Sequence, residues 1–400
     1  MAFFLVIFGA GLWGGFMYHG GMTSAPAYPK DLPILTSLRF FAAMVVVIHH
    51  FRYFAPFDLL AYTGFLHEGY LAVDFFFILS GFILTHVYAP QWQAGKMRAG
   101  DFIARRFARI YPLHFVTLLF MVGVALTPFR FGPVGPWPGE FPFLSLLNNF
   151  LMIQSWGMDG GLTFNVPSWS IAAEWFAYLC FPWLLPLMMG LRPGRALLVV
   201  AGLYAYVWLM SFSMDPTRPF TTYSFDCSIL RVMPDFILGI ALYRWSATRP
   251  VLGAAGVQLF AAACLAIALM HVRTPDIILI PIFCWMIRLG ADMSRMPQDA
   301  TGQRPATWLA RSFPVWLGDI SYALYMVHYP VMVVVLLVAH AVLSEEMYAK
   351  FFPLLAMAVV LASVAFSALL YRILEVPARR SVYTLLMTRT PLRRAPDHSK

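Results

Sequence analysis

The chain has 400 residues, of which 60% are hydrophobic and only 12% are charged. A soluble globular domain carries about twice this charged fraction, so the composition excludes an ordinary soluble protein. The formal net charge is +9. In a chain this apolar, an excess of Lys and Arg is typical of the cytoplasmic loops of a membrane protein, and we expect no nucleic-acid partner.

Long apolar runs recur along almost the whole chain. The hydropathy predicts ten spans, at about 36–54, 70–89, 109–127, 168–190, 196–213, 227–245, 252–271, 276–290, 314–342 and 350–374. Runs of this length indicate helices, which satisfy their own backbone hydrogen bonds inside lipid. We therefore predict an all-α fold, a polytopic transmembrane helical bundle with about ten spanning helices and membrane lipids as its surroundings.

Both ends of the chain lie outside this predicted bundle. Residues 2–18 are apolar but lack the positively charged start of a signal peptide. They could form an extra hydrophobic helix, either spanning or interfacial, or precede a true start at Met22. We assign residues 1–31 to an N-terminal extension and linker, 32–380 to the transmembrane core, and 381–400 to a basic cytoplasmic tail.

The basic residues indicate on which side of the membrane each loop lies. If the first span starts in the cytoplasm, 22 of the 28 Lys and Arg residues are cytoplasmic, which leaves Arg52, Arg130, Arg218, Arg231, Arg273 and Lys350 on the other side. This asymmetry predicts an integral protein, which we place in the bacterial inner membrane, with both ends of the core in the cytoplasm. The longest loop, about 128–167, is then extracytoplasmic, and its amphipathic piece at Phe143–Ile153 is predicted to belong to a partly ordered lid.

The first span holds ionisable residues in an apolar setting, where charged groups are costly and therefore functional candidates. Arg39 and His50 are eleven positions apart. On a helix this is almost three turns, so both side chains lie on one face, roughly 16 Å apart along the axis. His49 points to another face and is more readily explained as a packing hydrogen-bond donor.

Further polar residues occur along the other spans, namely Asp74, Arg106, Arg109, Glu174, Tyr325, His328 and Glu375. Each has a structural alternative. The arginines could only orient the chain or contact lipid headgroups, Asp74 could cap a helix, and Glu174 could be the counter-ion of a buried arginine. His50, Tyr325 and His328 could be polar packing contacts, and Glu375 could end the last span and pair with a tail arginine.

The four cysteines lie in apolar segments without the spacing of metal ligands, and we expect neither a metal site nor a disulfide framework.

Taken together, these residues form motifs in a fixed order. The chain resembles the acyltransferase-3 family of integral membrane O-acyltransferases from about Leu32 to Arg380. The resemblance is carried by Arg-x10-His at Arg39 and His50, the run Phe76–Phe82, Arg-x-x-Arg at Arg106 and Arg109, Trp-Ser-x-x-x-Glu ending at Glu174, and Ser-Tyr-x-x-Tyr-x-x-His ending at His328.

The resemblance implies transfer of an acyl group, commonly acetyl, from cytoplasmic acyl-CoA to a hydroxyl of a glycan, glycolipid or secondary metabolite. Acyl-CoA is then a donor substrate, not a permanently bound cofactor. His50 is expected to act as the catalytic base, because imidazole exchanges protons near neutral pH. Arg39, Arg106 and Arg109 are assigned to the CoA phosphates, and Glu174 to orienting or charge-balancing His50 or Arg39.

Asp74, Tyr325 and His328 are candidates for contacts with the substrate or with the oxyanion that forms during transfer. Some family members append a soluble esterase-like domain, and we recognise none in this sequence. The chain is therefore expected either to finish the transfer within the membrane or to hand the acyl group to a partner acyltransferase.

Two other classes of protein compete with an enzyme. A polytopic transporter or proton-coupled carrier would also contain intramembrane His, Asp, Glu and Arg residues. Against it, the sequence shows no repeated halves and no matched pair of broken helices. A non-catalytic membrane scaffold would leave the intramembrane charges unexplained.

The charge asymmetry generates a prediction about orientation. A reporter fused after Lys400 should read out as cytoplasmic, and one inserted near Gly135 as extracytoplasmic, because positive loops stay in the cytoplasm. A pair of reporters active on opposite sides of the membrane makes the measurement. The reverse pattern would contradict the topology and the side from which acyl-CoA enters.

Overall fold

A computed structural model describes residues 28–126, 143–159, 161–224, 226–247, 254–295 and 307–388. Within these ranges the chain is helical and contains no strand. The helices are α2 (Pro33–His50), α3 (Phe65–Glu68), α4 (Ala72–Gln93), α5 (Ala99–Ala125), α6 (Phe143–Leu151), α7 (Trp169–Gly190), α8 (Pro193–Met214), α9 (Ser228–Ser246), α10 (Ala255–His271), α11 (Leu279–Met293), α12 (Ser312–Asp319), α13 (Ser321–Val342), α14 (Glu345–Leu370) and α15 (Val376–Thr388).

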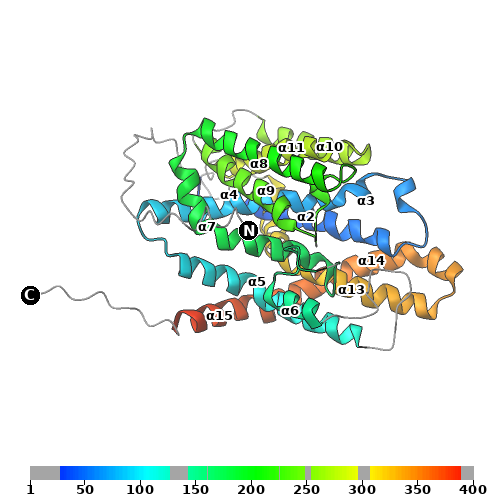
Figure 1. The fold of residues 1–400 in the computed structure, drawn as a ribbon. Helices are drawn as coiled ribbons and strands as arrows, with labels where there is room; N and C mark the ends of the chain where they lie inside the picture. Colours follow the sequence, from blue (N-terminus) through cyan, green and yellow to red (C-terminus); the bar gives the residue numbers. More distant parts are fainter. Residues whose placement is uncertain are drawn as a thin grey trace, which may run out of the picture.

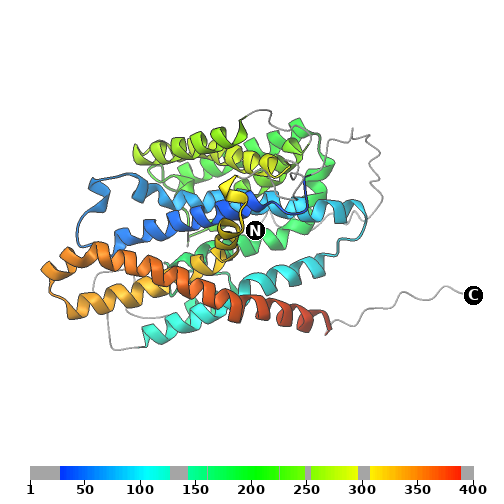
Figure 2. The same ribbon diagram turned by 180° about the vertical axis from the view of Figure 1, so that it is seen from behind.

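The predicted fold class is confirmed. Ten long helices occupy the ten predicted spans, and they run side by side along one common direction (Figures 1 and 2). Seven helical segments of the described chain are long and apolar enough to cross a membrane. Of the remaining three helices, α10 and α11 have 17 and 15 residues, and α9 carries charged residues along its length. The protein is an integral membrane protein.

The apolar surface agrees with this conclusion. Large hydrophobic side chains are exposed along α8 and α14, among them Leu198 (72%), Trp208 (58%) and Leu354 (67%). Exposed apolar patches on this scale are rare in soluble monomers, where they mark contact with a partner or a membrane. These two helices therefore present their outer faces to lipid.

Helix α2 lies inside the bundle and defines its two ends. It contacts α4, α11, α12 and α13, and it begins at Pro33, where a proline needs no hydrogen-bond donor. We call the end of the bundle at which α2 begins the Arg39 end, and the opposite end the His50 end. Helix α4 returns antiparallel to α2, since Gly69, just before α4, packs against His49.

Two predictions about the chain ends and the long loop fall wholly or partly outside the described residues. The N-terminal segment at 2–18 and the loop portion at 127–142 lie outside them. The amphipathic piece of that loop is helix α6. It is tied to α5, because Nε2 of His114 lies 2.8 Å from the carbonyl oxygen of Asn149.

Helices α4 and α9 cross at two facing glycines. A Cβ atom added to Gly81 would collide with the carbonyl group of Phe236, and one added to Gly239 would collide with the carbonyl oxygen of Ile78. Small residues at such a crossing let two backbones approach closely, and in lipid this packing is a main source of helix association. The crossing fixes α4, which carries much of the site described below.

We therefore predict that Gly81→Ala destabilises the fold, because the added methyl group meets backbone that cannot move aside. Overpacking of this kind costs about 1–3 kcal/mol or more. Thermal unfolding of the purified protein in detergent measures the loss. Gly202→Ala in α8 is the matched control, since a Cβ there meets nothing within 4 Å. An equal melting temperature for both variants would contradict the tight crossing.

Candidate functional site

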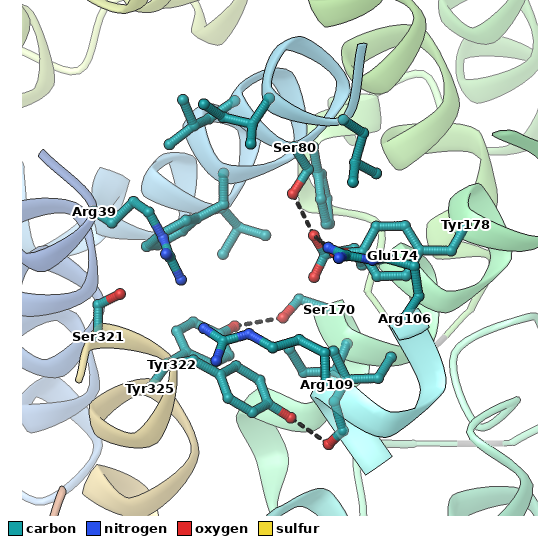
Figure 3. A pocket seen from close by; sticks show the side chains of 18 of the residues that line it. Arg39, Ser80, Arg106, Arg109, Ser170, Glu174, Tyr178, Ser321, Tyr322 and Tyr325 are labelled. Atoms are coloured by element: carbon teal, nitrogen blue, oxygen red, sulfur yellow. Dashed lines mark hydrogen bonds between the residues drawn. The ribbon is translucent and has the colours of Figure 1, made fainter. Parts of the chain in front are cut away.

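A cavity of about 200 Å³ lies between α2, α4, α5, α7 and α13, towards the Arg39 end of the bundle. Its apolar wall comes mainly from α4, including Phe76, Phe77 and Ile83. Its polar lining is Thr36, Arg39, Ser80, Arg106, Arg109, Ser170, Glu174, Tyr178, Ser321, Tyr322 and Tyr325. Figure 3 shows these side chains converging from separate helices. The cavity thus brings together five of the eight site residues predicted from sequence.

The three predicted arginines face this cavity from two helices. Arg39 enters from α2, and Arg106 and Arg109 enter from α5 (Figure 3). Arg109 forms an ion pair with Glu375. Arg106 lies 6.0 Å from the ring centres of both Tyr88 and Tyr178, and its Nε atom is buried with no hydrogen-bond partner among the described residues.

Arg39 has neither a salt bridge nor a hydrogen bond with any group in the described part of the chain. It interacts electrostatically with Glu174 and Glu375 without contacting either. Three guanidinium groups and the carboxylate of Glu174 line the cavity, and Glu375 pairs with Arg109 beside it. Three positive charges against two negative ones leave a net positive charge. An uncompensated positive charge inside a membrane protein is costly, which makes this cavity a candidate site for an anionic ligand.

Glu174 anchors the side of the cavity formed by α7. Its carboxylate accepts hydrogen bonds from the Ser80 hydroxyl and, at 2.5 Å, from the Tyr178 hydroxyl. The prediction placed Glu174 beside His50 or Arg39. The structure places it in the same cavity as Arg39, but its hydrogen-bond partners come from α4 and α7, and it makes no contact with His50.

Tyr325 closes the cavity on the side that faces the His50 end. Its hydroxyl lies 2.6 Å from the Ser170 hydroxyl and 3.1 Å from the carbonyl oxygen of Pro167. Its ring packs edge-on against Phe76 and, on the other side, against His328, with ring centres 6.1 and 6.0 Å apart. Tyr325 therefore stands between the arginine cavity and the histidines.

The two motif histidines meet beyond Tyr325. Nδ1 of His50 lies 2.8 Å from the carbonyl oxygen of Val46, and Nδ1 of His328 lies 3.1 Å from that of Leu324. A carbonyl oxygen only accepts, so both Nδ1 atoms carry the proton. Nε2 of His328 then presents a lone pair to Nδ1 of His50, 3.4 Å away.

This tautomer leaves Nε2 of His50 unprotonated and without a hydrogen-bond partner among the described residues. That lone pair can accept a proton from a substrate hydroxyl. His50 is also the last residue of α2. The partial negative charge at a helix C-terminus favours a nearby cation, so the position stabilises the imidazolium that forms when His50 takes up a proton.

His49 has a different environment. Its Nδ1 lies 2.7 Å from the carbonyl oxygen of Leu66, and its side chain packs against Gly69. These contacts hold the end of α2 to the segment before α4. This is the packing role expected of His49 from its position on the helix.

Asp74 lies apart from the cavity, in a buried ion pair. Both of its carboxylate oxygens accept from Arg231, at 2.9 and 2.6 Å, and Arg231 also donates to the carbonyl of Tyr70. Only 1% of Arg231 is exposed. Arg231 was counted from sequence among the loop residues of the extracytoplasmic side. Arg231 does lie at the His50 end of the bundle, but its charge is paired inside the bundle and therefore does not report topology.

The sequence did not reveal which groups these site residues contact. Ser80, inside the run Phe76–Phe82, reaches Glu174 from α4, and Tyr178 reaches it from one turn further along α7. Glu375 could have paired with a tail arginine, but its ion-pair partner is Arg109 of α5. We find no cluster of three or more potential metal ligands in the part of the chain described here.

Comparison with known proteins identifies the fold family. Residues 32–372 match the family model described as an acyltransferase domain. The chain is 31% identical to acyltransferase MdmB of Streptomyces mycarofaciens over 392 residues, which cover 92% of this chain and 95% of MdmB. No solved structure matches the chain.

A second relative is longer. The chain is 27% identical over 331 residues to peptidoglycan O-acetyltransferase OatA of Listeria monocytogenes, covering 76% of this chain and 49% of OatA. The chain therefore aligns with only about half the length of OatA, whereas it aligns with nearly all of MdmB.

The Asp74–Arg231 pair leads to a prediction that distinguishes a structural role of Asp74 from a contact between Asp74 and the substrate. Asp74→Asn removes the carboxylate that contacts the Arg231 guanidinium, although Asp235 remains as a nearby acidic group. Breaking a buried ion pair typically costs about 3–5 kcal/mol. The variant should lose most folded protein, measured as the monodisperse fraction after purification. The double variant Asp74→Leu/Arg231→Met should recover it. If Asp74→Asn instead folds normally and loses activity alone, Asp74 contacts substrate.

Proposed function

The chain belongs to this family of membrane acyltransferases, and we propose that it transfers an acyl group, commonly acetyl, from acyl-CoA to a hydroxyl group of a carbohydrate, glycolipid or related acceptor. Membership of the family decides in favour of an enzyme over a transporter or a scaffold. The donor, the acceptor and the roles of individual residues are the proposal.

The proposal that acyl-CoA is the donor rests on one observation. The cavity contains three arginines, and Arg39 has no counter-ion in direct contact among the described residues. The planar guanidinium group suits phosphate, which it binds through two parallel hydrogen bonds. The donor phosphates would supply the missing negative charge at this end of the bundle. The basic loops favour the cytoplasm for this end, which is where acyl-CoA is found.

The acyl arm would then reach from the arginine cavity to His50. Both residues lie on α2, and eleven residues of helix span roughly 16 Å. Tyr325 stands on this route, so the arm passes beside its ring or displaces it from Ser170. An acceptor that comes from the His50 end meets the thioester there. The two substrates would therefore enter from opposite ends of the bundle.

The chemistry needs one proton acceptor. Nε2 of His50 takes the proton from the acceptor hydroxyl as its oxygen attacks the thioester carbonyl carbon. A tetrahedral oxyanion forms, and the hydroxyl of Tyr325 would donate to it after leaving Ser170 and the carbonyl oxygen of Pro167. The carbon–sulfur bond then breaks, and the CoA thiolate takes the proton back from His50. The products are an acyl ester and free CoA.

His328 would support His50 in this cycle. When His50 becomes an imidazolium, its Nδ1–H is a stronger donor, and the lone pair on Nε2 of His328 is the neighbouring acceptor. This contact would hold the ring in the reactive tautomer, as an orienting acceptor does in other histidine-based sites. Glu174 would position the arginine cavity through Ser80 and Tyr178.

The acceptor class follows from the relatives. OatA is named for O-acetylation of peptidoglycan, which is a carbohydrate polymer, and the alignment with MdmB covers nearly all of that protein. We infer a carbohydrate or glycolipid hydroxyl outside the cytoplasm, modified by a protein in the bacterial inner membrane with cytoplasmic core ends.

Labelled transfer tests the proposal as a whole. Purified protein in nanodiscs should release CoA from acetyl-labelled CoA faster when an acceptor glycan is present. Mass spectrometry of surface glycans from cells with and without the protein should show a lost acetyl increment. Unchanged glycans together with no thioester turnover would exclude the proposed reaction.

Arg39→Ala is predicted to weaken binding of acetyl-CoA by about tenfold or more, because a charged hydrogen bond to phosphate contributes about 1.5–3 kcal/mol. Arg39→Lys should restore little of it, since an ammonium group cannot make the paired contact. Calorimetric titration of the purified variants measures both. If Arg39→Ala binds acetyl-CoA with wild-type affinity, Arg39 does not bind the donor and only helps to orient the chain in the membrane.

His50→Gln is predicted to lose about 10²–10⁴-fold in transfer rate while acetyl-CoA binding stays near normal, because glutamine keeps a polar group but cannot accept the proton. His49→Gln is the matched control and should be much milder, since glutamine can still donate to the carbonyl of Leu66. Near-normal turnover by His50→Gln would make His50 a structural contact.

A further inference from the structure

This inference rests on the proposed function, in which acyl-CoA is the donor. The arginine cavity is too small to enclose the whole of that molecule. Pockets that enclose ligands of drug size measure about 300–1,000 Å³, whereas this cavity measures about 200 Å³. An acyl-CoA carries a nucleotide with a diphosphate and a 3′-phosphate beyond its pantetheine arm. If the cavity arginines hold the phosphate nearest to the arm, and the arm runs on towards His50, the remaining phosphates must lie at the mouth of the cavity and need cationic partners there.

Helix α15 lies at this mouth. It follows α14 through the π-helical turn Tyr371–Glu375 and packs along α5 (Figures 1 and 2). Two contacts fix it there. Glu375 pairs with Arg109, and the hydroxyl of Tyr383 donates to Asp101 at 2.5 Å and accepts from Arg105 at 2.7 Å.

These contacts determine where Arg379 lies. Glu375, Arg379 and Tyr383 follow one another at intervals of four residues, so they lie along one face of the helix. The first and last of them touch α5. Arg379 is therefore held against α5 between the two contacts, one turn beyond the Arg109–Glu375 pair.

Arg379 has no hydrogen bond or ion pair with another described residue, and it is only partly exposed. Its charged neighbours are Arg106, Arg109, Glu375 and, from the end of α12, Asp319. Together with Arg39 and Glu174, these residues make four guanidinium groups against three carboxylates, so the mouth stays positive. The next residue, Arg380, is exposed.

We propose that Arg379 extends the arginine site beyond the cavity and binds a phosphate of the nucleotide end of the acyl-CoA donor. Helix α15 would then be part of the donor site, with the π-helical turn setting the face that it presents to α5. Turns of this kind are rare and often occur at functional sites. The Glu375–Arg109 pair would couple the position of Arg379 to the cavity itself.

Displacement of labelled acetyl-CoA from the full-length protein in nanodiscs tests this proposal. Three competitors divide the donor: unlabelled acetyl-CoA, adenosine 3′,5′-bisphosphate, which carries nucleotide phosphates without the arm, and S-acetylpantetheine, which carries the arm without phosphates. Arg379→Ala should weaken the first two by about tenfold, the size of one charged hydrogen bond. S-acetylpantetheine should compete equally well in both proteins.

Arg380→Ala is the matched control, since it removes the same charge from the adjacent exposed position, and it should change none of the three. Arg379→Lys keeps the positive charge but not the paired contact, so it should bind the bisphosphate more tightly than Arg379→Ala and less tightly than the wild type. It keeps the test open if the alanine variant does not fold. Nanodiscs of phosphatidylcholine alone and with phosphatidylglycerol distinguish a lipid phosphate from a donor phosphate.

Three results would overturn the proposal: equal effects of Arg379→Ala and Arg380→Ala, an equal loss for S-acetylpantetheine, or an Arg379 effect that occurs only with phosphatidylglycerol. Each of these leaves the proposed donor intact if the wild-type protein binds acetyl-CoA. Failure of the wild-type protein to bind acetyl-CoA is a separate outcome. It would contradict both the proposed donor and the proposed role of Arg379.

Discussion

The permanent charge of arginine inside a low-dielectric bundle is the constraint on which the site depends. A guanidinium group does not give up its proton, so each buried one needs a partner or a ligand. Arg231 has Asp74 and Arg109 has Glu375, and both pairs join helices that are distant in the sequence. Arg39 has no such partner among the described residues. The same physical requirement therefore joins helices at two places and leaves an uncompensated charge at a third, which is the basis of the proposed donor site.

The polar groups of the core are divided between the two ends of α2, and this division fits a reaction with two substrates. Fixed positive charge gathers at the Arg39 end, where a ligand must be held. Neutral imidazoles gather at the His50 end, where a proton must move. Tyr325 separates the two, with Ser170 on its hydroxyl and His328 against its ring. A single polar chamber would place both sets of groups in contact with both substrates, and with water.

Much of the fold could be predicted from sequence, because each span must be apolar and helical on its own in lipid. The ten predicted spans correspond to ten helices of the described chain. Two of them are less suited to crossing a membrane than the hydropathy predicted, since α11 is short and α9 carries charged residues. The site could be predicted in part, since an ionisable residue stands out in an apolar run. Its partners could not. Ser80 lies in the motif run Phe76–Phe82, but nothing in that run shows what its hydroxyl contacts. Only the packing of α4 against α7 and α9 brings Ser80 to Glu174.

Arg231 illustrates the limit of counting charges. A positive residue at a span end normally reports orientation, because moving an unpaired charge through the membrane is costly. Once Asp74 neutralises it, that cost falls and the residue carries no topological information. The same argument removes Arg109 from the cytoplasmic set, because Glu375 neutralises it. The asymmetry keeps its direction when both arginines are left out, so the predicted orientation rests on the loop residues alone, and with it the expectation that the donor reaches the arginine cavity from the cytoplasm.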